Sequence, residues 1–168
     1  QSLVEEAIGT VANHPVEAIC AGRTDAGVHA SGQVVHFDAV ATRSLRGWLL
    51  GINSNLPADI NATWAILVSD DFHARYSAQS RSYRYLILNR NVRSALYRHR
   101  AWWVHQSLAV ERMREAAECL HGEHDFSAFR AAGCQSKSPV REVFSINIER
   151  QDDWVSLTMT ANAFLQHM

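Results

Sequence analysis

The chain has 168 residues, of which 47% are apolar and 20% charged, a composition that suits one globular domain or two small ones. No apolar run reaches the ~20 residues of a membrane-spanning helix, and the first residues do not resemble a signal peptide. The net charge of −1 argues against a uniformly basic nucleic-acid binder. Three widely spaced cysteines without framework spacing indicate a reduced, cytoplasmic setting.

The first part of the chain predicts the order helix, strand, strand, helix, strand. Apolar spacing places these elements at residues 1–11, 15–20, 33–38, 45–56 and 61–68. Thr42 or Ser44 is the expected N-cap of the second helix, and Pro57 ends it.

The second part predicts strand, short strand, helix, strand, strand, helix. These elements fall at residues 81–88, 101–104, 107–121, 142–148, 154–160 and from about 163 onward, with Ser107 as a helix cap and Gly122 after that helix. Helices at both ends indicate a piece of a longer protein. With one more strand at each end, both halves become the ferredoxin-like β-α-β-β-α-β unit. We therefore expect an α+β fold with two such halves, residues 1–70 and 71–168, sharing a mostly antiparallel central sheet and truncated at both ends.

Arginine is concentrated in one acid-free part of the chain. Between Asp71 and Glu111 there is no acidic residue, but there are seven arginines: Arg75, Arg81, Arg84, Arg90, Arg93, Arg98 and Arg100. A guanidinium pairs bidentately with phosphate and stacks on bases, which an ammonium does not. The stretch is a candidate phosphate track or, equally well, a solvated surface.

The loop at residues 22–32 has the most unusual sequence in the chain. It links two predicted strands, contains three glycines and is longer than a routine hairpin connection. Asp25 is the only acid between Glu17 and Asp38, and Arg23 lies two residues before it. A carboxylate beside a cation and small residues can stay ionised and exposed, as covalent catalysis requires. An aspartate in a Gly-rich loop is otherwise a common turn former.

This loop resembles the nucleophile motif of the TruA-type tRNA pseudouridine synthases over Gly22-Arg23-Thr24-Asp25-Ala26-Gly27-Val28-His29-Ala30, and the likeness continues through Gly32-Gln33-Val34 and His36-Phe37. Other segments match in the order that the family has them: Asn53–Pro57, Asp71–Arg75, Arg81–Tyr85, Phe126–Arg130, Ser138–Glu142 and Asn162–Met168. The resemblance therefore covers essentially the whole chain.

The resemblance implies roles for three residues. Asp25 falls on the catalytic nucleophile, and Arg23 on the arginine thought to hold the place of the flipped-out nucleotide. Tyr83 falls on the tyrosine that stacks on the target base. The family also has a basic partner for the aspartate shortly after the segment that ends here at Met168, so we expect that residue outside the present sequence.

The resemblance also implies the reaction and its partners. The family isomerises uridine to pseudouridine at positions 38–40 in the anticodon stem-loop of tRNA, without a metal or other cofactor, and works as a cytoplasmic homodimer that holds one tRNA. RNA recognised by its shape and backbone fits an arginine-rich stretch. The candidates for backbone contacts are Arg75, Arg81, Arg84, Arg90, Arg93 and Arg98.

The sequence leaves one alternative function open, and two further features have structural explanations. A noncatalytic RNA-binding module is possible, because ferredoxin-like sheets with exposed aromatic residues often bind RNA; the RRM aromatic signature is absent, however. The segment Cys119–His124 contains a C-x-H-x-x-H pattern, which is not a standard zinc spacing. On strands, Tyr85, Trp102 and Trp103 are more often core residues than stacking platforms.

Overall fold

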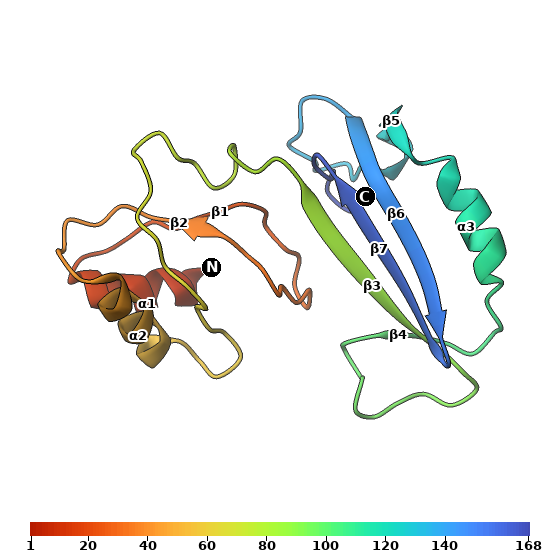
Figure 1. The fold of residues 1–168 in the computed structure, drawn as a ribbon, viewed down its shortest axis with the longest axis horizontal. Coiled ribbons are helices and arrows are strands. Elements are labelled where there is room, and N and C mark those ends of the chain that lie inside the picture. Colours follow the sequence, from red (N-terminus) through yellow and green to blue (C-terminus); the bar gives the residue numbers. More distant parts are fainter. The chain divides into compact units, whose positions relative to one another are not determined.

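The computed structural model describes all 168 residues and has a mixed α/β fold. The chain divides into two compact units, Gln1–Ala78 and Gln79–Met168, each with its own helical and sheet elements (Figure 1). None of its helices has the length and apolar character needed to cross a lipid bilayer.

The first unit contains two helices and a short antiparallel sheet. Its elements are α1 (Ser2–Ala12), β1 (Ile19–Cys20), β2 (Val35–His36) and α2 (Leu45–Asn55). Ser44 caps α2 as predicted, because its Oγ accepts a hydrogen bond from Gly47 N at 3.0 Å. The two helices approach closely at Gly51, where an added Cβ would lie 2.9 Å from Val11 Cγ2.

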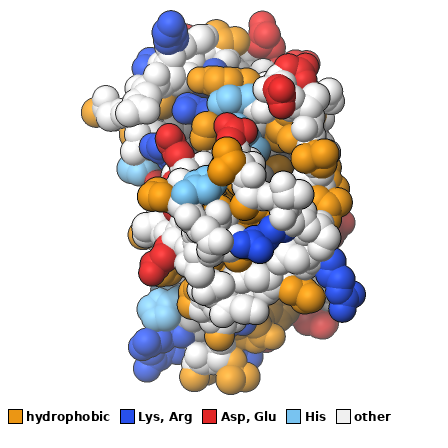
Figure 2. Space-filling model, turned by 90° about the vertical axis from the view of Figure 1, so that its left-hand side faces the viewer, with side chains coloured by type: hydrophobic (Ala, Val, Ile, Leu, Met, Phe, Trp, Pro, Cys, Tyr) orange, Lys and Arg blue, Asp and Glu red, His pale blue; other side chains and the backbone are white.

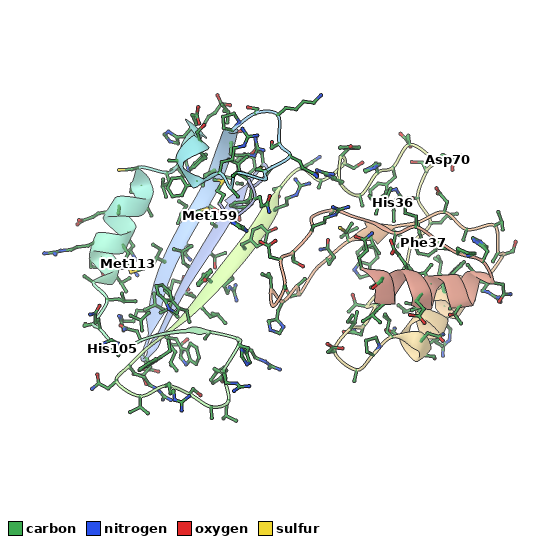
Figure 3. The ribbon with its side chains drawn as sticks, turned by 180° about the vertical axis from the view of Figure 1, so that it is seen from behind. His36, Phe37, Asp70, His105, Met113 and Met159 are labelled. Carbon is green, nitrogen blue, oxygen red and sulfur yellow. The ribbon has the colours of Figure 1, made fainter.

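The core of the first unit lies between these helices and the chain that follows β2. Ile8 of α1 and Trp48 of α2 are both buried there. The Phe37 ring meets the indole of Trp48 edge-on at 5.3 Å, so Phe37, labelled in Figure 3, ties the end of β2 to the helices. This packing fixes one end of the loop that carries Asp25.

The strand predicted at residues 61–68 is absent, and that prediction was wrong. The segment has no ladder partners, and its larger apolar side chains are exposed, with Leu67 at 90%. An apolar run becomes a strand only where a neighbouring strand supplies backbone hydrogen bonds. The predicted strands at 15–20 and 33–38 form, but only two residues of each pair in a ladder.

The second unit is built around a five-stranded sheet. Its elements are β3 (Arg81–Asn89), β4 (Trp102–Val104), α3 (Val110–Glu118), β5 (Gly122–Asp125), the 3-10 turn η1 (Ser127–Phe129), β6 (Val140–Gln151) and β7 (Trp154–Ala161). The strand order is β4-β3-β7-β6-β5, antiparallel except for the β3–β4 pair. Helix α3 runs along β6 on one face of the sheet (Figure 1).

Two buried clusters hold this unit together. Val110 and Met113 of α3 pack against Ile87 and Val155, and Figure 3 shows Met113 on the helix beside the sheet. A second cluster lies where β6 begins and β7 ends; its buried members are Phe126, Val143, Ala161 and Leu165. Burying each of these larger side chains is worth about 1.5–3 kcal/mol.

Asn89 joins the end of β3 to the chain before α3. Its Nδ2 donates to the carbonyls of Val104 and Gln106 at 2.9 and 2.7 Å. Its Oδ1 accepts from Leu108 N at 3.1 Å and from the Arg150 guanidinium at 2.7 Å. The side chain is therefore fully hydrogen-bonded although the residue is only 8% exposed.

These bonds shorten the predicted helix at 107–121. Residues 104–108 are held in an extended course by Asn89, so α3 begins only at Val110. Its N-cap is Ala109 without a side-chain hydrogen bond, and the prediction that Ser107 caps the helix was wrong. After α3 the chain forms β5, which the sequence analysis did not predict.

The helix predicted to begin near Ala163 is also absent. Leu165 is 4% exposed because it inserts into the second cluster. Ala131 N donates to the carbonyl of Gln166 at 3.1 Å, which holds the segment against the loop after β5. Its apolar spacing therefore reflects tertiary packing rather than a helical face.

Candidate functional site

The loop that carries Asp25 is closed at its base by Gln33. Beyond the β1–β2 ladder, Ala21 N donates to Val34 O at 2.8 Å. The side-chain amide of Gln33 then continues the hydrogen bonding as a backbone peptide group would. Its Nε2 donates to Gly22 O at 2.6 Å, and its Oε1 accepts from Gly22 N at 3.4 Å. One amide thus holds both backbone groups of Gly22 and fixes where the loop leaves the strands.

Asp25 stands in a turn and is exposed. Val28 N donates to the Asp25 carbonyl at 3.1 Å, and Gly27 between them has a φ of 83°. Within the first unit the Asp25 carboxylate accepts no hydrogen bond and forms no ion pair, including with Arg23, which is also exposed. The backbone is anchored, while the carboxylate is open to a ligand.

A second segment that matches the family packs against the end of β2. Ala74 N donates to His36 Nδ1 at 3.1 Å, and Ala74 is 3% exposed. The His36 ring, labelled in Figure 3, lies 4.8 Å from His73 and meets Phe72 edge-on at 6.0 Å. Arg75, one of the predicted contacts to the RNA backbone, follows Ala74 directly in the chain. The Asp25 loop and the 71–75 segment are therefore positioned by the same strand.

Tyr83 lies on β3, opposite Met159 of β7, with 40% of its surface exposed. Its ring and that of Phe164 meet edge to face, with 4.9 Å between the ring centroids and an interplanar angle of 88°. The tyrosine is thus held on one side and open elsewhere, as a stacking platform needs to be. Asp25 belongs to the first unit and Tyr83 to the second, so their joint action on one nucleotide stays a prediction.

The aromatic residues further along the sheet are exposed, and the expectation that they lie in the core was wrong. Tyr85 is 61% exposed, Trp102 59% and Trp103 40%. The Tyr85 and Trp102 rings meet edge-on at 6.5 Å. Their position explains the exposure: α3 covers the region of Ile87 and leaves the strand residues beside it open.

The arginines predicted to contact the RNA backbone are spread over several elements and do not share one face of a strand. Arg81 donates to Asn162 O at 2.9 Å, and Arg84 donates from the opposite face of β3 to Thr158 Oγ1 at 3.3 Å. Arg90 pairs with Asp153 at 3.7 Å. Arg93 and Arg98 line a cavity of about 170 Å³ together with Tyr97 and Trp103. Figure 2 shows a face of the first unit, where charges of both signs are interspersed.

The histidines of the Cys119–His124 segment are engaged by the backbone. His121 Nε2 lies 3.0 Å from Phe144 O, and His124 Nε2 lies 2.8 Å from His121 O. No group of three His, Cys, Asp or Glu side chains is arranged to hold a metal ion. These hydrogen bonds give both histidines a structural role.

Comparison with known proteins shows which proteins this chain is similar to. The sequence profile of the tRNA pseudouridine synthases matches residues 116–168. Over all 168 residues the chain is 54% identical to tRNA pseudouridine synthase A of Coxiella burnetii, 52% to that of Alcanivorax borkumensis and 51% to that of Shewanella amazonensis. The chain belongs to the tRNA pseudouridine synthase family. It spans only 63–64% of the length of these relatives.

For a member of the tRNA pseudouridine synthase family, the structure adds two positioning residues that the sequence analysis missed. Gln33 holds the base of the Asp25 loop, and Phe164 packs against the ring of Tyr83. Both lie inside segments that match the family. A glutamine in a loop otherwise made of small residues was a usable signal. Phe164, in contrast, could be linked to Tyr83 only through the register of β3 and β7.

Proposed function

We propose that the protein to which this chain belongs isomerises uridine to pseudouridine at positions 38–40 in the anticodon stem-loop of tRNA, with Asp25 as the nucleophile. One observation carries the proposal: an open Asp25 carboxylate on an anchored loop, in a chain 54% identical to a tRNA pseudouridine synthase A. The decisive experiment, replacement of that carboxylate by an amide, is argued in the Discussion.

The proposed mechanism gives each predicted residue a task. Removing the target base from its stack costs a few kcal/mol, and stacking on the Tyr83 ring returns about 1–3 kcal/mol. Arg23 occupies the place that the nucleotide leaves. Asp25 attacks the base or the sugar, the N1–C1′ bond breaks, and the base turns. C5 then bonds to C1′, the bond to Asp25 breaks, C5 loses its proton and N1 gains one, so the net reaction needs no oxidant or reductant.

The proposal extends to architecture and assembly. We infer that residues 1–70 and 71–168 are ferredoxin-like halves sharing a mostly antiparallel sheet of the pseudouridine synthase type, and that the protein acts in the cytoplasm as a homodimer on one tRNA. The antiparallel pairing of β3, β7, β6 and β5, with α3 on one face, supports the inference of a ferredoxin-like arrangement for residues 71–168. Light scattering of the full-length protein should give twice the chain mass.

A noncatalytic RNA-binding role is the second candidate. The exposed rings of Tyr83, Tyr85 and Trp102 on one sheet favour it, because aromatic side chains on a sheet stack on unpaired bases. A binder would retain tRNA affinity and form no pseudouridine even with Asp25 intact. An enzyme would bind tRNA and also form pseudouridine.

Arg90 and the two arginines that line the cavity, Arg93 and Arg98, give a test of backbone binding. Replacing Arg90, Arg93 and Arg98 together by glutamine should weaken tRNA binding, because the loss of each phosphate contact reduces the number of counterions that binding releases. The slope of log K against log salt should fall in magnitude by about 0.7–0.9 for each contact. Filter binding at several salt concentrations measures it. An unchanged slope would mean that these side chains face solvent or protein in the complex.

The turn beside Asp25 gives a second test. Gly27 has a φ of 83° with no atom within 4 Å of an added Cβ, so Gly27→Ala strains only the backbone. That strain is about 1–2 kcal/mol, and if it displaces Asp25 the rate should fall about 5–30-fold. Gly32→Ala is the matched control, since Gly32 lies in the same loop, has no positive φ and also has open space. Equal rates of pseudouridine formation in the two variants would show that the turn does not position Asp25.

A further inference from the structure

Two guanidinium groups converge on the loop between β5 and β6. Arg141, the second residue of β6, is half-buried and donates to Ser138 O at 3.0 Å and to Ser136 Oγ at 2.5 Å. Arg130 is exposed and donates to Ser136 O at 2.5 Å and to Cys134 O at 3.2 Å. Both cations therefore bind the same short stretch of chain.

No carboxylate neutralises this pair. The two ion pairs within the units, Arg90–Asp153 and Arg114–Glu111, lie elsewhere. The acceptors of Arg130 and Arg141 are carbonyls and one hydroxyl, all uncharged. Burial lowers the pKa of Arg141, the negative charge of a Cys134 thiolate opposes this effect, and the neighbouring cations Arg130 and Arg81 lower the pKa further. Arginine nevertheless stays charged at neutral pH, so the positive charge is retained.

One nitrogen of the Arg141 guanidinium is left without a hydrogen bond. Its Nε is buried and has no hydrogen-bond partner. A buried N–H without a partner costs about 1–3 kcal/mol, and like charges held together add to that cost. The Arg141 Nε is sealed from solvent, so an anion would act on the like charges instead: bound at the exposed Arg130, it would offset their repulsion. Phosphate is such an anion, and guanidinium groups bind it in bidentate fashion.

The pair lies at the end of the sheet that carries Tyr83. Arg81, two residues before Tyr83 on β3, donates to Asn162 O at 2.9 Å. Asn162 N in turn donates to the carbonyl of Glu142, which follows Arg141 on β6, at 3.0 Å. Phe164, two residues beyond Asn162, packs on the Tyr83 ring. The cations and the predicted stacking platform thus belong to one packed end of the second unit.

We propose that Arg130 and Arg141, with Arg81 beside them, bind a backbone phosphate of the RNA strand next to the nucleotide that stacks on Tyr83. The inference rests on the proposed function, because it assumes an RNA strand at Tyr83. These arginines position the strand through its backbone and carry no base specificity. Of the three, only Arg81 was among the backbone candidates predicted from sequence.

The test compares single-charge variants of the full-length protein. Arg130→Gln removes a cation from an exposed site, so the fold should survive. Arg112→Gln is the matched control, because Arg112 is an exposed arginine on α3. Binding of an anticodon stem-loop RNA is measured as a function of salt. We expect the slope to fall in magnitude by about 0.7–0.9 in Arg130→Gln, to remain unchanged in Arg112→Gln, and to be restored in Arg130→Lys.

Several outcomes would overturn the inference. If the slope of log K against log salt is the same for Arg130→Gln and the unchanged protein, Arg130 has no phosphate contact. If the melting temperature also falls, its role is structural. Equal losses in Arg130→Gln and Arg112→Gln would indicate a general charge effect. Inorganic phosphate should compete with the RNA more weakly in Arg130→Gln than in the unchanged protein; equal competition would also count against the site. If the unchanged protein forms pseudouridine and these comparisons fail, only this inference falls. If it forms none, the proposed function falls.

Discussion

Asp25→Asn is expected to abolish pseudouridine formation in the full-length protein while tRNA binding persists. The amide has nearly the shape of the carboxylate but is not a nucleophile, so no covalent intermediate forms. Loss of a covalent nucleophile costs other enzymes as much as about 10⁶-fold, and we expect at least about 10⁴-fold here. Release of tritium from tRNA containing 5-tritiated uridine measures the rate directly. Since Asp25 is exposed and unpaired within its unit, the melting temperature should hardly change.

Asp38→Asn is the matched control for charge. Asp38 is an exposed acid shortly after β2, so this variant loses the same negative charge outside the loop. It should isomerise tRNA at the normal rate. Measurable product from pure Asp25→Asn, or an equal loss in Asp38→Asn, would refute the nucleophile assignment.

Replacing Tyr83 should separate stacking from proton transfer. Tyr83→Ala removes the ring and should weaken substrate binding about 5–150-fold, the equivalent of about 1–3 kcal/mol of stacking. Tyr83→Phe keeps the ring and its contact with Phe164 but loses the hydroxyl. If that hydroxyl removes the C5 proton, Tyr83→Phe should bind tRNA and form an adduct that does not release product. If the ring alone matters, Tyr83→Phe should retain activity.

Tyr85 provides the control on the same strand and face. It is more exposed than Tyr83 and contacts Trp102 rather than Phe164. Tyr85→Ala should bind and isomerise tRNA almost normally. The amount of covalent protein–RNA adduct, measured on a denaturing gel, should be the same as for the unchanged protein. A larger loss in Tyr85→Ala than in Tyr83→Ala would move the stacking role to Tyr85 and contradict the assignment made here.

Elements with local signals could be predicted from sequence, and elements that depend on distant partners could not. α1 and α2 follow apolar stripes, and Ser44 supplies a cap within its own turn. β3, β6 and β7 are long runs of strand-forming residues. The run at 61–68 is also rich in strand-forming residues, but no neighbouring strand pairs with it. The segment after Ala161 has helical spacing, yet Leu165 is drawn into a cluster formed by residues far earlier in the chain.

The candidate site shows the same division. Asp25, Arg23 and Tyr83 were selected through short motifs, which need no knowledge of tertiary structure. The roles of Gln33 and Phe164 depend on which backbone group or ring lies opposite, and sequence spacing does not reveal that register. The arginines were grouped by position in the chain, but alternation along β3 sends Arg81 and Arg84 to opposite faces.

The strand order has a consequence for biosynthesis. β3 lies between β4 and β7, and its long antiparallel ladder is with β7, so Tyr83 is paired only after Met159 has been made. At ribosomal speeds of about 5–20 residues per second, that delay is about 4–15 s. During this interval residues 1–78 have already been synthesised, whereas β3 presents an unpaired edge rich in aromatic and apolar residues. The nascent chain should therefore rely most on chaperones while β3 waits for β7, and synonymous codons that slow translation between them should increase aggregation.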